Sequence, residues 1–279
     1  ASLGAAFDPG WSKYQNSQSY YFNLNANFKP HKDWTFGIIA SASYSKERGY
    51  GDFKARDYAK GTSRTMDPNA YHAYDYTPFN IKNELTNNYR DYKTADVRLQ
   101  ASLDWQPIQQ IRLSALAGVR YQDQYNITNR TENSNTSQVY RSMGKRYIRE
   151  SNSYLYKPLD DPTALPEIVM PYGGLRTTQE IVYERFDLQG KVNYNDSFAD
   201  GKHTISAVAG AELYDNHNMN EWHDAYGVNY ELGYLTTYSP LLFTRLRNQS
   251  LQYYQINPTV DRAISFIGNA EYAYLGRYK

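Results

Sequence analysis

The stretch ADVRLQASLDWQPIQQIRLSALAGVRY, residues 95–121, decides the fold of this chain. From Ala95 to Trp105 every second residue is apolar, and polar residues stand between them. After the short connection QPIQQ, the same alternation runs from Ile111 to Tyr121. Because successive side chains of a strand point to opposite faces, this pattern predicts two β-strands joined as a hairpin, each with one apolar and one polar face.

Five further runs with a period of two lie elsewhere, at residues 18–30, 34–45, 185–194, 205–213 and 264–274. The first two of these are separated by only a few residues around Pro30, which predicts a second hairpin. The helical period of 3.6 fits nowhere over a useful length. The chain is therefore predicted to be all-β, with about seven antiparallel strands.

The connections between these runs alternate between short and long. Short ones are expected at about 30–33, 106–110, 195–202 and 275–279, and long ones at about 46–94, 123–181 and 215–262. The long connections exceed the usual limit of ~15 residues for loops in compact domains several times over. Outer-membrane barrels, by contrast, combine short periplasmic turns with long extracellular loops. The alternation thus favours a partial transmembrane antiparallel β-barrel.

Composition excludes several classes of function. The 279 residues contain 30 Lys plus Arg and 29 Asp plus Glu, a net charge of +1, which argues against a basic nucleic-acid surface. The absence of Cys excludes disulfides, thiolate nucleophiles and Cys-ligated metal sites. A mean hydropathy of −0.79 and the lack of a long apolar run exclude a transmembrane helix, but not strands that alternate.

Aromatic residues stand at both ends of the apolar stripes, and Leu, Ile, Ala and Gly stand between them. Aromatic rings with one polar edge favour the level of lipid headgroups, so these residues are predicted to form two membrane-interface girdles. The predicted girdle residues are Tyr20, Phe22, Trp34, Phe36, Tyr44, Trp105, Tyr121, Tyr194, Tyr272 and Tyr274. Small mid-strand residues would leave voids in the core of a soluble sandwich, whereas lipid chains fill against any surface.

Several stretches of the chain resemble the SusC/RagA family of TonB-dependent outer-membrane transporters. They are residues 95–121 quoted above and the runs NLNANFKPHKDWTFGIIASASYSKERG, DDPTALPEIVMPYGG, ERFDLQGKVNYNDSFADGKHTISAVAGAELY and FIGNAEYAYLGRYK. The resemblance covers nearly the whole chain. It implies a segment of a 22-stranded barrel, residues 1–279, without the plug domain and the TonB box. It also implies the outer membrane of Bacteroidota as location, TonB and a SusD-like surface lipoprotein as partners, and glycans or, for some members, oligopeptides as substrates.

Candidate contacts to ligand or partner are aromatic residues expected in the long extracellular loops. They are Tyr71, Tyr74, Tyr76, Trp222, Tyr226, Tyr230, Tyr234 and Tyr238. A rigid tyrosine loses little rotamer entropy when its ring stacks on a sugar or a peptide. The alternative is that these rings pack the loops together or onto the lipoprotein.

No catalytic residue, cofactor or metal site is expected. The group His217, Glu221, His223 and Asp224 lacks a usual metal-ligand spacing and is predicted to lie in a solvated loop. Asp160 and Asp161 precede a proline and predict a turn rather than a Ca²⁺ site. No phosphate-binding loop or nucleophile motif is present, so the chain is not expected to be an enzyme.

The sequence thus favours TonB-dependent import of nutrient oligomers, glycans ahead of oligopeptides, by a barrel in contact with outer-membrane lipid. Two alternatives remain open. One is a passive outer-membrane porin or surface adhesin built on the same wall. The other is a secreted soluble β-domain that binds carbohydrate, which would cover the apolar face with a second layer of protein.

Overall fold

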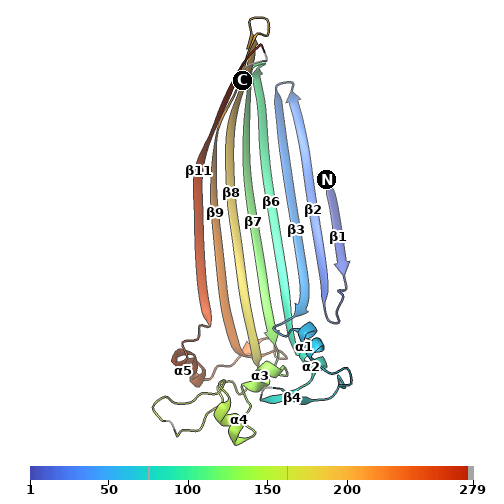
Figure 1. The fold of residues 1–279 in the computed structure, drawn as a ribbon, viewed down its shortest axis with the longest axis vertical. Helices are drawn as coiled ribbons and strands as arrows, with labels where there is room; N and C mark the ends of the chain where they lie inside the picture. The colour runs from blue at the N-terminus through green and yellow to red at the C-terminus, as the bar shows by residue number, and fades with distance from the viewer. Residues whose placement is uncertain (75, 162, 276–279) are drawn as a thin grey trace.

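The computed structural model describes residues 1–74, 76–161 and 163–275, and these form one large antiparallel sheet with short helices at one end (Figure 1). The sheet has nine strands. Their bounds are β1 Ser2–Asp8, β2 Asn16–His31, β3 Trp34–Tyr50, β6 Asn88–Ile108, β7 Ile111–Arg130, β8 Gly174–Phe198, β9 His203–Asn229, β10 Leu235–Thr236 and β11 Tyr254–Tyr274. The prediction of an all-β fold is confirmed.

The strands follow one another in the sheet almost as they do in the sequence. The order is β1-β2-β3-β6-β7-β8-β9, and β9 pairs on its other side with both β10 and β11. All these pairings are antiparallel. Among the described residues the sheet does not close on itself, because β1 and β11 each have one free edge. The seven long strands correspond to the seven predicted runs.

The predicted boundaries of the long connections were wrong, because the strands extend far beyond their apolar runs. Strand β8 has 25 residues and β9 has 27. The long connections therefore shrink to residues 51–87, 131–173 and 230–253. The outer parts of these strands carry polar residues on both faces, so hydrogen-bonded pairing continues where the alternation of apolar and polar residues has stopped. Strand β1, which pairs with β2, was not predicted either.

The three long connections carry the remaining elements and lie together at one end of the sheet (Figure 1). These elements are α1 Ala55–Gly61, β4 His72–Tyr74, β5 Thr77–Phe79, α2 Ile81–Asn87, α3 Asn135–Val139, α4 Arg146–Ser151 and α5 Pro240–Asn248. Within the described ranges, no helix has the length and apolar character needed to cross a membrane. We call this end of the molecule the loop cap. The opposite end carries the short turns.

The pairing register decides which residues share a face. Residues directly opposite each other in neighbouring strands point to the same side. Ile38 pairs with Ala101, and the same level continues through Ala117 and Leu188 to Leu213. All ten predicted girdle residues lie on this face, which we call the apolar face. The alternate residues, among them Arg98, form the polar face.

The apolar band on this face runs obliquely across the strands. On β3 it ends at Tyr44, but on β9 it ends at Leu213, whose level on β3 is that of Ile38. This is a shift of about six residues, or ~20 Å along the strands, over four strand spacings of ~4.8 Å each. The band therefore makes an angle of roughly 45° with the strands, close to the strand tilt of barrels.

No second layer covers the apolar face in the part of the chain that the structure describes. Side chains in the middle of the band stay open, with Leu99 48% and Phe266 83% exposed. None of the five central residues Leu24, Ala40, Leu99, Ala117 and Ala209 is buried. A sandwich would have buried them. The described residues that form a buried hydrophobic cluster lie instead at the loop cap.

Glycines allow the ends of β8 and β9 to meet at the base of the loop cap. Gly173 and Gly227 both have positive φ, 70° and 67°. A Cβ added at Gly173 would lie 2.4 Å from the carbonyl carbon of Gly227, and one added at Gly227 would lie 2.3 Å from the carbonyl oxygen of Thr237. Three backbone segments thus pass closer than any side chain would permit.

The substitution Gly227→Ala is expected to destabilise the loop cap by about 1–3 kcal/mol, since it adds both a clash and an unfavourable φ. Gly144→Ala is the matched control, because a Cβ at Gly144 meets nothing within 4 Å. Hydrogen exchange of residues 224–237 in the full-length protein measures the effect. Equal protection in the two variants would contradict this account.

Candidate functional site

The loop cap contains the hydrophobic core of the described residues. It combines Tyr140, Val169, Met170, Leu175, Tyr226, Leu242 and Leu246, with Tyr156 and Leu241 packed against it. Helix α5 supplies Leu242 and Leu246, each 1% exposed. The segment after α3 supplies Tyr140, and the strands β8 and β9 supply Leu175 and Tyr226. The second and third long connections are therefore fixed to the sheet by burial of apolar side chains.

Arg245 of α5 holds two connections together at this core. The side chain is 5% exposed, and its Nε and Nη2 atoms donate to the carbonyl oxygen of Ser153 at 3.3 and 3.1 Å. The guanidinium lies over the rings of Tyr140 and Tyr154, 5.6 and 5.8 Å from their centroids. Burial raises the pKa of Tyr140, so its ring stays neutral beside the cation. These contacts stabilise the buried charge, although its Nη1 atom has no hydrogen-bond partner and no carboxylate of the described residues forms an ion pair with it.

Glu84 connects the first and second long connections. It is 2% exposed and accepts hydrogen bonds from the Nδ2 of Asn88 and the backbone N–H of Asn135, both at 2.8 Å. Asn135 also donates through Nδ2 to the Oγ1 of Thr77 at 2.5 Å. A buried carboxylate that accepts well-placed hydrogen bonds gives this junction one defined geometry.

Glu84→Ala is expected to destabilise the junction by about 2–5 kcal/mol, because it leaves two buried donors without an acceptor. Glu167→Ala, at an exposed position of the second connection, serves as the control. Limited proteolysis of the full-length protein within residues 77–88 and 131–137 gives the readout. If both variants resist the protease equally, Glu84 does not hold the first and second long connections together.

The eight predicted contact residues do not form one cluster. Tyr226 is 8% exposed in the core, and the hydroxyl of Tyr230 donates to the carbonyl oxygen of Leu175 at 2.6 Å. Burial raises the pKa of both phenols. Tyr76 donates to the carbonyl oxygen of Ser151 at 3.0 Å. These three rings thus take part in packing the cap, which was the alternative weighed for them.

Three of the predicted residues lie in strands, and one of these, Tyr74, ends the short strand β4 within the first long connection. Trp222 and Tyr226 belong to strand β9, so their expected placement in a loop was wrong. Trp222 is directly opposite Gln179 and Gln255, on the polar face. The side chain of Tyr74 lies outside the described residues.

The other predicted tyrosines present open aromatic surface. Tyr71 is 63% exposed, Tyr234 51% and Tyr238 48%. Tyr234 lies against Arg176, whose guanidinium carbon is 4.8 Å from the ring centroid. Tyr238 contacts Phe243, which in turn contacts Tyr253, at centroid distances of 5.7 and 5.6 Å. The aromatic group Tyr238, Phe243 and Tyr253 is the most connected exposed surface of this kind on the third connection.

The group His217, Glu221, His223 and Asp224 also lies on β9, so the prediction of a solvated loop was wrong. The register places Glu221 opposite Ile256 and His223 opposite Tyr254, on the apolar side of the sheet. Asp224 points to the other side, where its Oδ1 accepts a hydrogen bond from Thr177 at 2.5 Å. The four side chains therefore cannot converge on one ion.

Elsewhere in the described ranges, no group of three His, Asp or Glu side chains is arranged to hold a metal. Asp161 accepts hydrogen bonds from the backbone N–H and the hydroxyl of Thr163, at 2.8 and 2.6 Å, as expected for a turn. These bonds lower the pKa of Asp161.

One arrangement could not be found from the sequence, namely a row of arginines on the polar face. Arg98 of β6 lies directly opposite Arg120 of β7, which lies directly opposite Arg185 of β8. The three residues are more than 20 positions apart in the chain at each step. Each belongs to a polar stripe that the alternation predicts, but only the register shows that they share one level.

Comparison with solved structures finds the same fold in a known transport complex. The chain superimposes on a chain of the RagAB peptide importer in its "closed-closed" state with a TM-score of 0.64 and 13% sequence identity, covering 93% of this chain and 26% of that one. For the "open-open" state the TM-score is 0.62 at 13% sequence identity, and the match covers 93% of this chain and 26% of that one. For a further structure of the RagAB peptide transporter the TM-score is 0.60 at 14% sequence identity, and the match covers 94% of this chain and 27% of that one.

The chain thus spans about a quarter of the length of the solved chains that it matches. At this identity the likeness concerns the fold alone, which is a large antiparallel sheet. A search of protein-family models and one of curated proteins each gave no match.

Proposed function

We propose that residues 1–279 are a segment of the β-barrel wall of a TonB-dependent outer-membrane importer, whose plug and TonB box lie in other parts of the protein. The observation that carries this proposal is the oblique apolar band, bordered by aromatic residues and open on its outer side. Hydrocarbon is the medium that such a face requires. The fold of RagAB supports the same assignment.

In this arrangement the short turns face the periplasm and the loop cap faces the outside. The exposed tyrosines Tyr71, Tyr234 and Tyr238 then surround the extracellular mouth, where a SusD-like lipoprotein would bind. The RagAB structures are of peptide importers, so we propose oligopeptides ahead of glycans as cargo. This reverses the order that the sequence resemblance suggested. Bacteroidota remain the proposed source.

The membrane assignment predicts which tryptophans contact lipid. Trp34 and Trp105 stack on the apolar face with ring centroids 4.9 Å apart, whereas Trp222 lies on the polar face. In full-length protein reconstituted into vesicles, brominated lipid chains are expected to quench the fluorescence of Trp34 and Trp105, measured with the other tryptophans replaced by Phe. A variant that retains only Trp222 should be quenched much less. Equal quenching would refute the assignment of the lipid-facing band, because Trp222 lies on the polar face and also beyond Leu213, where the band ends on β9.

The importer hypothesis predicts energy-dependent uptake. Cells that produce the full-length protein and its partner should accumulate an oligopeptide only while the TonB system is energised. Dissipation of the proton gradient is expected to reduce accumulation to the background of cells without the protein. Uptake that continues unchanged would instead support a passive porin. Protein that remains monomeric in buffer without detergent would support the soluble domain.

A further inference from the structure

The row of Arg98, Arg120 and Arg185 places like charges directly opposite one another on three neighbouring strands. Opposed residues on one face have Cβ atoms about 5 Å apart, and like charges in such pairs destabilise a sheet. A row of this kind therefore needs compensating negative charge. The structure supplies some of it on the flanking levels of the same face.

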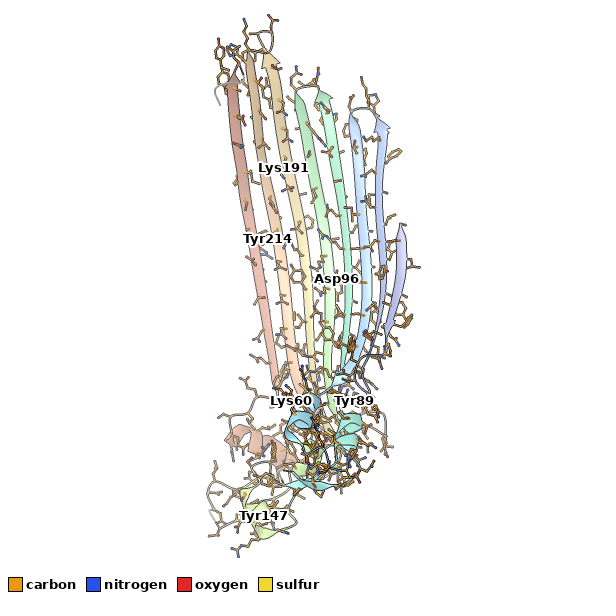
Figure 2. All side chains as sticks on the ribbon, turned by 45° about the vertical axis from the view of Figure 1, so that its right-hand side comes forward. Lys60, Tyr89, Asp96, Tyr147, Lys191 and Tyr214 are labelled. Atoms are coloured by element: carbon orange, nitrogen blue, oxygen red, sulfur yellow. The ribbon has the colours of Figure 1, made fainter. Side chains whose placement is uncertain are left out.

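Two of the three arginines have their own carboxylates. Arg120 binds Asp96 with an Nη2 to Oδ2 distance of 2.5 Å, and Arg185 binds Asp187 with an Nη2 to Oδ1 distance of 2.7 Å. Asp96, which is labelled in Figure 2, lies two residues from Arg98 on the same strand and one level nearer the loop cap. These ion pairs are partly open to solvent, because the two arginine side chains are 41% and 37% exposed.

Arg98 differs from its two neighbours. Its Nη2 donates to the neutral amide oxygen of Gln100 at 3.2 Å, and no carboxylate of the described residues lies within ion-pair distance. The row thus contains three cations and two directly paired anions. Glu212, which also borders this region, is hydrogen-bonded to Gln189 at 3.5 Å on a level further along the strands.

A hollow of about 400 Å³ lies against this row on the polar face. Its lining includes Arg98, Arg120, Arg185, Gln100, Gly118 and Asp187. Gly118 keeps the hollow open between Gln100 and Asp187, because it contributes no side chain at that level. The lining therefore combines the guanidinium and amide groups with two carboxylates, those of Asp187 and Glu212.

Acceptor groups without partners lie beside the same row. The Oδ1 atom of Asn216, directly opposite Arg185, and that of Asn218, directly opposite Tyr183, are buried without a hydrogen-bond partner among the described residues. Because these two oxygen atoms are shielded from solvent and their residues do not line the hollow, an incoming ligand meets the arginines and not these acceptors. Arg98 supplies the cation that recognises a carboxylate.

We propose that this hollow is a binding site for the carboxylate of an acidic oligopeptide, with Arg98 as its free cation and Arg120 and Arg185 as supporting charges. The proposal rests on the proposed function, because it specifies the cargo of the same importer. The site would favour Glu- or Asp-containing peptides over neutral ones of equal length as they pass along the polar face.

The test uses two peptides of equal length that differ only in Glu or Gln, in cells that produce the full-length importer and its partner. Arg98→Gln is expected to lower uptake of the Glu peptide about threefold to tenfold relative to the Gln peptide. Arg98→Lys should retain most of the preference, since it retains the charge. Arg112→Gln is the matched control. Arg112 lies on the same face of β7, paired with Asp104, near the short-turn end.

The outcomes distinguish a carboxylate of the peptide from a carboxylate of the protein itself. They also distinguish failure of the proposed site from failure of the proposed importer function. If Arg98 holds a carboxylate of the protein itself, Arg98→Gln will change uptake of both peptides equally, and the proposal is overturned. If the unaltered protein imports neither peptide, the proposed importer function is rejected. The proposed site is then tested by measuring binding of the two peptides to the purified full-length protein in detergent. Tighter binding of the Glu peptide that Arg98→Gln abolishes supports the site, and equal binding of both peptides rejects it.

Discussion

The structure depends on one constraint, which is that a single antiparallel sheet satisfies the backbone hydrogen bonds of its strands but buries neither of its faces. One face carries a band of Leu, Ile, Ala and Gly with aromatic borders, and the described residues place no protein against it. The other face is polar and charged. Such a sheet is stable only where two different media meet its two sides. The oblique course of the band is consistent with strands that tilt across a membrane.

The loop cap, unlike the sheet, buries apolar side chains within the protein. Its side chains pack against each other as they do in a soluble domain, around Tyr140, Leu242 and Leu246. Buried polar contacts of Glu84 and Arg245 add specific geometry to this packing. The described parts of the connections are thus packed together rather than extended as separate links between strands. Ordered connections can present open rings such as Tyr238 in a fixed position, which lowers the entropic cost of binding a partner.

The polar face has its own electrostatic organisation. Arg120 and Arg185 are each bound to an aspartate, whose negative charge opposes the repulsion between the two arginines. Similar pairs recur along the same face, with Arg112 bound to Asp104 near the short turns. Within the arginine row, Arg98 differs from Arg120 and Arg185, because among the described residues it binds a neutral amide and no carboxylate. Charge that the fold leaves unmatched is available to a solute.

Periodicity in the sequence was sufficient for the class of fold, the seven long strands and the composition of the two faces. Each of these depends on neighbours in the chain, such as Leu99 between Arg98 and Gln100. The true ends of the strands were not predictable, since beyond Tyr121 or Leu213 hydrogen-bonded pairing continues without an apolar signal.

Local sequence patterns were also insufficient to place the predicted site residues. The sequence identified the rings of Tyr226 and Tyr230 but could not tell that they pack the cap. It also grouped His217 and Asp224 in one loop, although a strand separates them onto opposite faces. Local order along the chain therefore determined the strands and their two surfaces. Only the register between distant strands decided which charges meet at one level, because pairing joins residues that the sequence keeps far apart.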